Sequence, residues 1–597
     1  MSNYQAPMRD MQFLLHEVFK AEQLWATMPA VEELIDKDTA DAILSEGAKL
    51  TSEVIAPLNR NSDEQGATWS NGDVTTPDGF AKAYQLYCEG GWGSLSGDPE
   101  HGGMGMPKML QSFVEEMTQS ASISFALYPM LTAGASLALS AHASTEMKQT
   151  YLENMYSGQW AGTMCLTEPH AGSDLGIMTA KAEAQDDGSF ALSGTKIFIT
   201  GGEQDLTENI IHLVLAKIPG APEGPRGISM FVVPKFLLND DGSLGARNTV
   251  TCGSIEHKMG IKGSATCVMN FDGAKGFLVG EENKGLNYMF TMMNYERLGM
   301  GIQGVGAAET SYQQAAEYAI ERIQGRSANG VKSADKKADS LIVHPDVRKM
   351  LLTMRAFNEG GRCFSTYVAK QLDIVKFSAD EAQKKQAEQL VALLTPVAKA
   401  FMTDMAYESC NLGQMVFGGH GYVREWGQEQ LVRDVRIAQI YEGTNGIQAL
   451  DLLGRKVAAN KAKFLDVYVA EINTFIEKNT QQQALDNFVK PLANALKKLS
   501  TVTELIITEQ AHDKSMVGAS ATDYLAAFGL VSYAYMWALM AEKSLDQNDD
   551  DFYQAKLYVG EFFMERLLPR IDGHILAIEA GSKSLMSMPE GLFNYNH

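Results

Sequence analysis

The sequence predicts an α+β protein that is mainly α-helical. Ala, Leu, Met and Glu recur at helical spacing over the first 160 residues, and this pattern returns near Gly285. Between these regions, short stretches of alternating β-branched or aromatic residues are separated by turn signals. Because strands and helices are segregated along the chain, a doubly wound sheet is not expected. No GxGxxG follows a first strand, so a dinucleotide would not be held in the Rossmann manner.

The 597 residues are too many for one simple core, and we expect four regions. Residues 1–160 form an N-terminal helical domain, interrupted by the glycine-rich loop Gly90–Pro107. Residues 161–280 form a central antiparallel β domain, and residues 281–454 form a helical bundle. The polar stretch Gly325–Leu341 is predicted to be an exposed loop within that bundle. Residues 455–597 form an additional C-terminal helical domain.

The composition is that of a soluble globular protein, with 45% hydrophobic and 21% charged residues. A net charge of -23 argues against nucleic-acid binding, which needs a basic surface. The six cysteines form no CxxC pair and the eleven histidines are dispersed, so we expect no metal site and free thiols in a reducing cytoplasm. The uncharged run Tyr524–Ala541 is interpreted as a buried bundle helix. No integral membrane span is expected, and peripheral membrane contact stays open.

The segment Arg433–Gln448, RDVRIAQIYEGTNGIQ, places Glu442 where an apolar run meets a tight polar turn. The residues after it, Gly443 and Thr444, suit close approach of a backbone to a ligand. A carboxylate in this position is partly desolvated, which raises its pKa and makes it a better general base. Taken alone, the motif is more typical of a carboxylate at the start of a helix or of a surface glutamate.

Two further segments suit a flat heterocycle. Met164–Asp174, MCLTEPHAGSD, supplies Thr167 and Ser173 around a turn. Lys196–Gly201, KIFITG, is a predicted strand in which Phe198 and Thr200 share one face because they are two residues apart. An aromatic ring can cover a ring face while a hydroxyl bonds a ring heteroatom.

Two more segments suit phosphate binding and close backbone approach. Tyr318–Arg326, YAIERIQGR, makes Arg322 and Gln324 available for phosphate. Phe417–Tyr422, FGGHGY, contains the adjacent glycines Gly418 and Gly419. Each of the four segments alone is more typical of a helix start, a core strand or a turn between helices.

In this order and at these separations, TEPHAGSD, KIFITG, FGGHGY, RD and IYEGTNGIQ resemble the acyl-CoA dehydrogenase flavoprotein family over about residues 40 to 455. The stretches EGGWGSLSGDPEHGGMGMP and HPDVRKMLLT further resemble a long bacterial subgroup that includes 3-methylmercaptopropionyl-CoA dehydrogenases. The resemblance implies FAD as the cofactor and α,β-desaturation of an acyl-CoA thioester.

The resemblance also implies roles for individual residues. The expected catalytic base is Glu442. The expected FAD-binding residues are Met164, Leu166, Thr167, Ser173, Phe198, Thr200, Arg322, Gln324, Gly418, Gly419 and Thr444. The expected substrate-binding residues are Ser173, Arg297, Tyr441 and Gly443. Met415 stands where most members have Gln, which leaves an FAD contact of that side chain open.

The implied mechanism has Glu442 removing the pro-R α-proton while a β-hydride passes to flavin N5. The Glu442 backbone N–H and an FAD ribityl hydroxyl would donate hydrogen bonds to the thioester carbonyl. Another branch of the family keeps its catalytic glutamate at the position of Glu296, where the sequence reads NYERLGMG. Since this chain has both residues, we expect Glu442 to be the base and Glu296 to be a structural partner.

The family also defines the rival functions. An acyl-CoA oxidase shares the fold and FAD but passes electrons to oxygen, whereas a dehydrogenase passes them to an electron-transfer flavoprotein, which we expect here. The DNA-binding alkylation-response relatives need a basic tail, but Leu453–His597 has 14 Lys and Arg against 18 Asp and Glu. A homodimer is expected. Acyl chain length stays open and depends on a pocket near Phe125–Met130.

Overall fold

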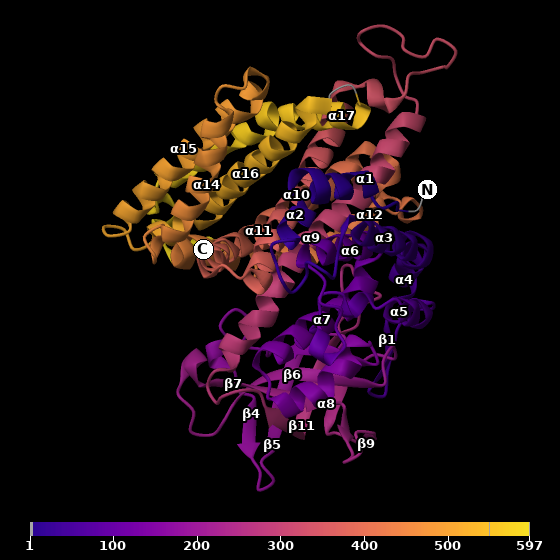
Figure 1. The fold of residues 1–597 in the computed structure, drawn as a ribbon, viewed down its shortest axis with the longest axis vertical. Helices are drawn as coiled ribbons and strands as arrows, with labels where there is room; N and C mark the ends of the chain where they lie inside the picture. The colour runs from indigo at the N-terminus through magenta and orange to yellow at the C-terminus, as the bar shows by residue number, and fades with distance from the viewer. Residues whose placement is uncertain (1–3, 548–549, 596–597) are drawn as a thin grey trace. The chain divides into compact units, whose positions relative to one another are not determined.

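The computed structural model describes residues 4–547 and 550–595, and confirms a mainly helical α+β fold (Figure 1). It divides into two compact units, which are described separately here. Unit 1 holds Pro7–Asp41 and the chain from Met300 onward, and unit 2 holds Ala42–Gly299. The boundary falls within the long helix α9, Gly285–Glu321.

Unit 2 combines short helices with a β-sheet. Its helices are α3 (Lys37–Lys49, which begins in unit 1), α4 (Asn59–Gln65), α5 (Phe80–Glu89), α6 (Lys108–Ala121), α7 (Ile123–His142) and α8 (Thr145–Tyr156). Its strands are β1 (Thr68–Ser70), β2 (Asp73–Thr75), β3 (Trp160–Cys165), β4 (Lys181–Ala184), β5 (Phe190–Thr200), β6 (Asn209–Lys217), β7 (Ile228–Pro234), β8 (Phe236–Leu238), β9 (Leu244–Arg247), β10 (Val250–Ile255) and β11 (Thr266–Leu278).

The central sheet has the order β10-β11-β5-β4-β6-β3, with β7 paired to both β11 and β6. The expectation of a purely antiparallel sheet is wrong, because β6 has two parallel neighbours. Strand β3 pairs with it from Trp160 opposite Asn209 to Cys165 opposite Val214, and β4 pairs with it at Lys181 opposite Lys217. A parallel pair needs a crossover connection, and the long β4–β5 excursion between β3 and β6 supplies it. Strand β3 is buried along almost its whole length and packs against α7.

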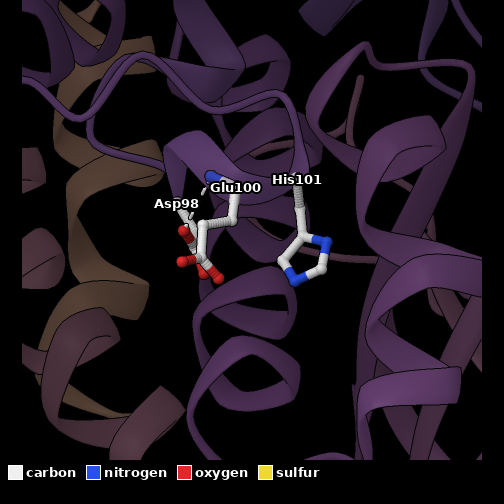
Figure 2. Close-up of side chains that lie close together, drawn as sticks. All are labelled: Asp98, Glu100 and His101. Carbon is white, nitrogen blue, oxygen red and sulfur yellow. Dashed lines mark hydrogen bonds between the residues drawn. The ribbon is translucent and has the colours of Figure 1, made fainter.

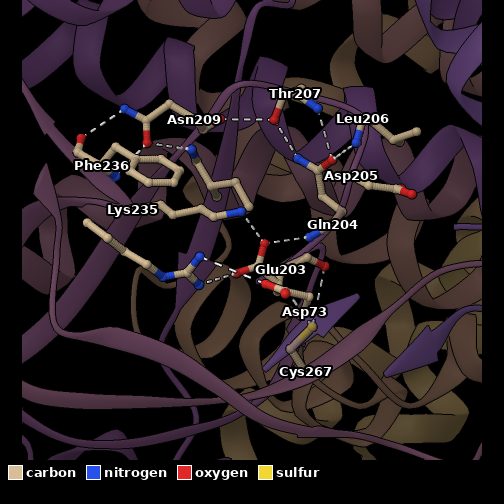
Figure 3. Close-up of polar contacts among 12 residues, drawn as sticks. Asp73, Glu203, Gln204, Asp205, Leu206, Thr207, Asn209, Lys235, Phe236 and Cys267 are labelled. Carbon is tan, nitrogen blue, oxygen red and sulfur yellow. Dashed lines mark hydrogen bonds and ion pairs between the residues drawn. The ribbon is translucent and has the colours of Figure 1, made fainter. Parts of the chain in front are cut away.

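A buried polar network lies beside the sheet in unit 2 (Figure 3). The Glu203 carboxylate, 3% exposed at its side chain, forms ion pairs with Lys235 and with Arg247, the latter at 3.0 Å. The Asn209 side chain donates to the Phe236 carbonyl at 3.0 Å and accepts from the Phe236 N–H at 2.9 Å. Because both charges and amides have partners, these polar groups can be buried at low cost.

Unit 1 is helical. Its helices are α1 (Met8–Gln12), α2 (Ala21–Trp25), the second part of α9, α10 (Pro345–Phe377), α11 (Glu381–Val416), α12 (Gln428–Arg436), α13 (Asn445–Leu450), α14 (Lys463–Asn479), α15 (Asp486–Glu509), α16 (Met516–Ser544), α17 (Asp551–Phe562), α18 (Ile571–Glu579) and α19 (Lys583–Met586). Helices α14, α15 and α16 lie side by side, and α16 also packs against α10 and α11 (Figure 1). The predicted loop Gly325–Leu341 connects α9 and α10 and is mostly exposed.

Among the described residues, three helices, α7, α11 and α16, are long and apolar enough to cross a membrane by length and composition. Within their most apolar windows, 83%, 72% and 89% of the residues are buried inside the protein. The run Tyr524–Ala541 lies in α16, where Phe528, Tyr533 and Trp537 are at most 1% exposed. This burial agrees with the prediction of a bundle helix.

Five buried charges join distant parts of the chain in unit 1. Asp10 of α1 forms ion pairs with Arg362 of α10 and Lys556 of α17. Arg362 also pairs with Glu309 of α9 at 3.0 Å, and Lys556 pairs with Glu359 of α10 at 2.8 Å. Burial alone would raise the pKa of Asp10, but Lys556 and Arg362 hold it below its usual range. The network therefore fixes the first helix and the C-terminal helices onto the bundle.

Replacing Asp10 with Asn should destabilise unit 1, because Arg362 and Lys556 would lose a buried counter-charge. Breaking a buried ion pair by removing one partner costs about 3–5 kcal/mol. We expect the urea midpoint of unfolding to fall for Asp10→Asn and to stay unchanged for Asp335→Asn, whose side chain is exposed in the α9–α10 loop. Equal midpoints for the two variants would contradict this role of the network.

Candidate active site

Glu442 lies in the turn between the 3-10 helix η11 (Ile437–Gln439) and α13. Its φ is 55° and that of Gly443 is 81°, so two successive residues have left-handed backbones. A non-glycine residue in this region costs on the order of 1–3 kcal/mol and persists only where the surroundings impose it. Thr444 caps α13 by accepting a hydrogen bond from the Ile447 N–H at 3.4 Å. The backbone therefore turns sharply at the predicted base.

The turn is held from α11 through Asn445. Lys399, which is fully buried, donates to Asn445 Oδ1 at 2.8 Å. Asn445 Nδ2 donates to Thr403 Oγ1 at 3.0 Å and to Asp404 Oδ1 at 2.7 Å. Burial raises the pKa of Asp404, while the hydrogen bonds it accepts act in the opposite direction. These contacts explain why position 445 is an asparagine, because its side-chain amide supplies both donor and acceptor atoms.

Two further contacts fix the residues around Glu442. The Gln448 side chain is buried and donates to the Glu442 carbonyl at 3.0 Å. A Cβ at Gly443 would lie 2.6 Å from Gln448 Nε2, so glycine is needed there for steric reasons as well. The Tyr441 hydroxyl donates to Gln303 of α9 at 2.6 Å. Glu442 is half-buried, as expected of a carboxylate at the edge of an apolar segment.

The glycine turn at FGGHGY forms the 3-10 helix η9 (Gly418–Tyr422) at the end of α11. A Cβ added at Gly418 or Gly419 would meet no atom within 4 Å, so this backbone is open to close approach. Gln414 donates to the Gly421 carbonyl at 3.0 Å and holds the turn. Met415 is 66% exposed. Gln414 thus supports the turn, while the neighbouring Met415 offers no hydrogen bond at the surface.

Arg322 and Gln324 follow the end of α9, and both are exposed. The Gln324 backbone is fixed, since its N–H donates to the Asp339 carbonyl at 2.9 Å and its carbonyl accepts from His344 at 2.8 Å. Arg326 is instead engaged with Asp339, at 3.2 Å. Of the two arginines, Arg322 is therefore the one whose exposed guanidinium suits a phosphate.

In unit 2, the loop after β3 is joined to β5 by a buried ion pair. Lys196 is fully buried and donates to Glu168 at 2.9 Å and to the Leu166 carbonyl at 3.0 Å. Burial lowers the pKa of Lys196, against the effect of Glu168. This pair is not among the residues expected from the sequence, although a lysine inside the apolar strand KIFIT and a glutamate in TEP are signals for it.

The predicted strand KIFITG is irregular at the candidate cofactor residues. The register of β5 against β11 shifts between the pairs Lys196–Met269 and Ile199–Cys267, which marks a β-bulge. Phe198 has a φ of 61° and is 58% exposed, whereas Ile199 is 2% exposed and Thr200 is half-buried. The bulge therefore places an aromatic side chain at the surface, with a hydroxyl two residues later.

Of the other expected residues of unit 2, Met164 lies in β3, while Leu166, Thr167 and Ser173 lie in the loop after it and Arg297 lies in α9. Met164 is half-buried, Leu166 is buried, Thr167 is half-buried and Ser173 is exposed. Glu296 is 1% exposed and lies against α7, where a Cβ at Gly134 would come within 2.3 Å of its Oε1. Arg297 is also buried and donates to Asn294 at 3.3 Å.

One group of possible metal ligands lies in unit 2: Asp98, Glu100 and His101 have ligand atoms within 4.8 Å of one another (Figure 2). Asp98 caps the short 3-10 turn that follows it, because its carboxylate accepts from the Glu100 N–H at 3.0 Å. It also accepts from the Ser140 hydroxyl at 3.1 Å. These contacts account for Asp98 as a capping residue, and Glu100 is exposed.

Four family models match the chain in succession. They are the N-terminal domain (residues 37–159), middle domain (163–274) and C-terminal domain (283–457) of acyl-CoA dehydrogenase, and an acetyl-CoA dehydrogenase C-terminal-like domain (468–589). A 3-methylmercaptopropionyl-CoA dehydrogenase of Ruegeria pomeroyi is 42% identical, covering 95% of this chain and 96% of its own length. A butyryl-CoA dehydrogenase of Syntrophomonas wolfei is 35% identical, covering 99% of each chain.

Solved structures show the same fold. Caenorhabditis elegans ACDH-11 in complex with C11-CoA covers 100% of this chain and 97% of its own, with a TM-score of 0.80 and 19% identity. A Bacillus anthracis acyl-CoA dehydrogenase complexed with FAD covers 94% and 91%, with a TM-score of 0.74 and 21% identity. The chain therefore belongs to the acyl-CoA dehydrogenase family of FAD-dependent oxidoreductases.

Proposed function

We propose that the protein oxidises an acyl-CoA thioester to the trans-2-enoyl-CoA, with Glu442 as the base that removes the α-proton. The observation that carries this proposal is the half-buried carboxylate of Glu442 on a left-handed turn that Asn445 ties to α11. A catalytic base must be held at a defined position relative to the proton that it removes. The contacts of Asn445 and Gln448 hold the backbone of the turn in such a position.

The residues of the predicted cofactor site fit FAD. In unit 2, Phe198 offers an exposed aromatic face, Thr167 and Thr200 offer hydroxyls, and Met164 and Leu166 offer apolar surface. In unit 1, the open glycines Gly418 and Gly419 allow backbone approach, and the exposed Arg322 suits a pyrophosphate. Thr444 and Gln324 complete the set. When bound, FAD supplies at N5 the acceptor for the β-hydride.

Glu442 takes the pro-R α-proton, and its backbone N–H donates a hydrogen bond to the thioester carbonyl, where negative charge develops. A donor placed at such an oxygen contributes about 2.7–4 kcal/mol to stabilisation of the transition state. Tyr441 and Gly443 flank the acyl group, while Ser173 and Arg297 contact the rest of the substrate. Glu296 is the alternative base, but its nearly complete burial against Gly134 favours a structural role.

We propose an electron-transfer flavoprotein as the electron acceptor, which makes the protein a dehydrogenase rather than an oxidase. The dehydrogenase names of the relatives that match nearly the full length of the chain support this choice. We further propose a cytoplasmic homodimer. Hydrogen peroxide formation at the rate of flavin reduction in air would instead identify an oxidase.

We further propose that the acyl group is short. Helices α6, α7 and α9 of unit 2 enclose a cavity that includes Ala126, Pro129 and Met130, within or beside the segment where the sequence placed the acyl pocket. Its volume is ≈ 20 Å³, little more than one water molecule needs. Relatives named for butyryl-CoA and 3-methylmercaptopropionyl-CoA agree with a short chain.

Polar side chains close one side of this cavity. Gln111 donates to the Tyr295 hydroxyl at 2.8 Å, Tyr295 donates to Glu115, and Lys108 pairs with Glu115 at 2.6 Å. A longer alkyl chain would have to displace these groups from their partners, which is costly for buried polar atoms. The cavity therefore favours butyryl- and methylthiopropionyl-CoA over longer chains.

Replacing Glu442 with Gln should remove the base while keeping the shape of the side chain. We expect the rate of anaerobic flavin reduction by butyryl-CoA to fall by about 10²–10⁴-fold or more. Stopped-flow absorbance of the oxidised flavin measures this rate. Glu296→Gln is the matched control and should retain rapid reduction. The assignment of the base is wrong if Glu296→Gln is inactive and Glu442→Gln is not.

Replacing Met130 with Ala should enlarge the cavity and admit longer chains. Each methylene that a pocket accepts changes specificity by about 10–200-fold. We expect the ratio of kcat/KM for octanoyl-CoA to that for butyryl-CoA to rise at least about tenfold. Met155→Ala is the control, because Met155 is a buried methionine of α8 outside this cavity. An unchanged ratio for Met130→Ala would show that the acyl chain lies elsewhere.

A further inference from the structure

We propose that Lys196 is a positioning residue of the flavin site, which fixes the loop after β3 on β5 and raises the reduction potential of the bound flavin. The inference rests on the proposed function, since it assumes that Leu166, Thr167 and Phe198 contact FAD. Its own basis is the buried ion pair of Lys196 with Glu168, which lies between the two segments that carry these residues.

The Lys196–Glu168 ion pair contacts both ends of the loop between β3 and β4. Glu168 accepts hydrogen bonds from the Thr179 N–H at 2.7 Å, the Thr179 hydroxyl at 2.9 Å and the Ala180 N–H at 3.0 Å. Glu168 and Ala171 also exchange two backbone hydrogen bonds of 3.0 Å. Since Lys196 donates to Glu168 and to the Leu166 carbonyl, one ammonium group ties the start of the loop, its centre and its return to β4.

The same ammonium group acts on the strand that carries Phe198. Lys196 lies on β5 just before the β-bulge, and the next residue, Ile197, donates from its N–H to the Thr167 carbonyl at 2.9 Å. Loop and bulge are therefore joined at two successive residues of the strand. Loss of the Lys196 contacts would leave the left-handed backbone at Phe198 without one of these two supports.

Lys196 also polarises the peptide group that links two of the candidate cofactor residues, Leu166 and Thr167. The Leu166 carbonyl and the Thr167 N–H belong to the same peptide unit, so a charged donor on the carbonyl strengthens the N–H as a donor. Among the described residues, the Thr167 N–H donates none of the backbone hydrogen bonds made outside regular helices and strands. A stronger N–H donor favours the more negative, reduced flavin over the oxidised flavin.

A purely structural ion pair makes a different prediction. A buried pair can often be replaced by uncharged residues of similar size with little loss of stability, whereas removing one partner leaves an uncompensated charge. The double variant Lys196→Met/Glu168→Gln removes both charges together. If the pair is only structural, this variant should bind FAD with the affinity and potential of the unchanged protein.

The test measures the dissociation constant for FAD and the two-electron midpoint potential of the full-length protein, of the single variant Lys196→Met and of the double variant Lys196→Met/Glu168→Gln. Lys235→Met is the matched control, because Lys235 is a buried lysine in the same unit whose partner Glu203 lies outside the loop (Figure 3). We expect both Lys196 variants to bind FAD at least tenfold more weakly. We also expect their preference for reduced flavin to fall about tenfold, which corresponds to about 30 mV for a two-electron couple.

The outcomes distinguish a positioning role of Lys196 from a purely structural ion pair. The proposal is supported if both Lys196 variants are folded and lose FAD, or hold it at a more negative potential, while Lys235→Met does neither. A double variant with the affinity and potential of the unchanged protein would overturn it, as would equal changes in Lys235→Met. If the unchanged protein itself takes up no FAD, or its flavin is not reduced by any acyl-CoA, the proposed function fails independently of Lys196.

Discussion

The contacts between Asn445 and helix α11 are the constraint on which the candidate active site depends. They hold Glu442 and Gly443 in left-handed conformations. Without this support, the strained backbone of Glu442 would relax, because it is not a glycine. Helix α11 can provide this support because Lys399 and Thr403 are fully buried on it. Their polar atoms would be costly to bury alone, so the turn and the helix satisfy each other.

The C-terminal helices support α11 in turn. Phe401 of α11 packs edge-on against Tyr533 of α16, with ring centroids 4.9 Å apart. A Cβ at Gly529 of α16 would lie only 2.2 Å from the Phe401 ring, so this glycine permits the close packing. The buried charges around Asp10 fix α17 onto the same bundle. The C-terminal region thus contributes to the rigidity of the helix that holds the turn, and it does so within unit 1.

The sequence predicts the order of helices and strands well, because hydrophobic periodicity is a local property. It also identifies the turn at Glu442, since Gly443, Thr444 and Asn445 are residues that favour tight turns. It does not predict the parallel pairing of β3 with β6, which depends on the path of the intervening strands. Nor does it predict the ion pairs of Asp10 with Lys556, because no local pattern relates residues so distant in the chain.

The Lys196–Glu168 ion pair is predictable from the sequence only in part. Both residues occur inside the motifs that the sequence singles out, yet their charges would be assigned to solvent on general grounds. Only the bulge in β5 shows that Lys196 points inward while Phe198 is exposed. Strand alternation alone would place Lys196, Phe198 and Thr200 on one face. A register shift of this kind is set by the neighbouring strand β11, so it lies beyond sequence reasoning.

The measurement that tests the account most directly is the rate of flavin reduction in Asn445→Ala, which keeps Glu442 but removes its anchor on α11. If the turn positions the base, the rate should fall about 10²-fold, as expected for a catalytic group displaced by roughly 1 Å. The melting temperature and FAD content serve as controls for folding. A correctly folded, FAD-loaded Asn445→Ala protein that is reduced at the original rate would contradict the claim that this constraint makes Glu442 an effective base.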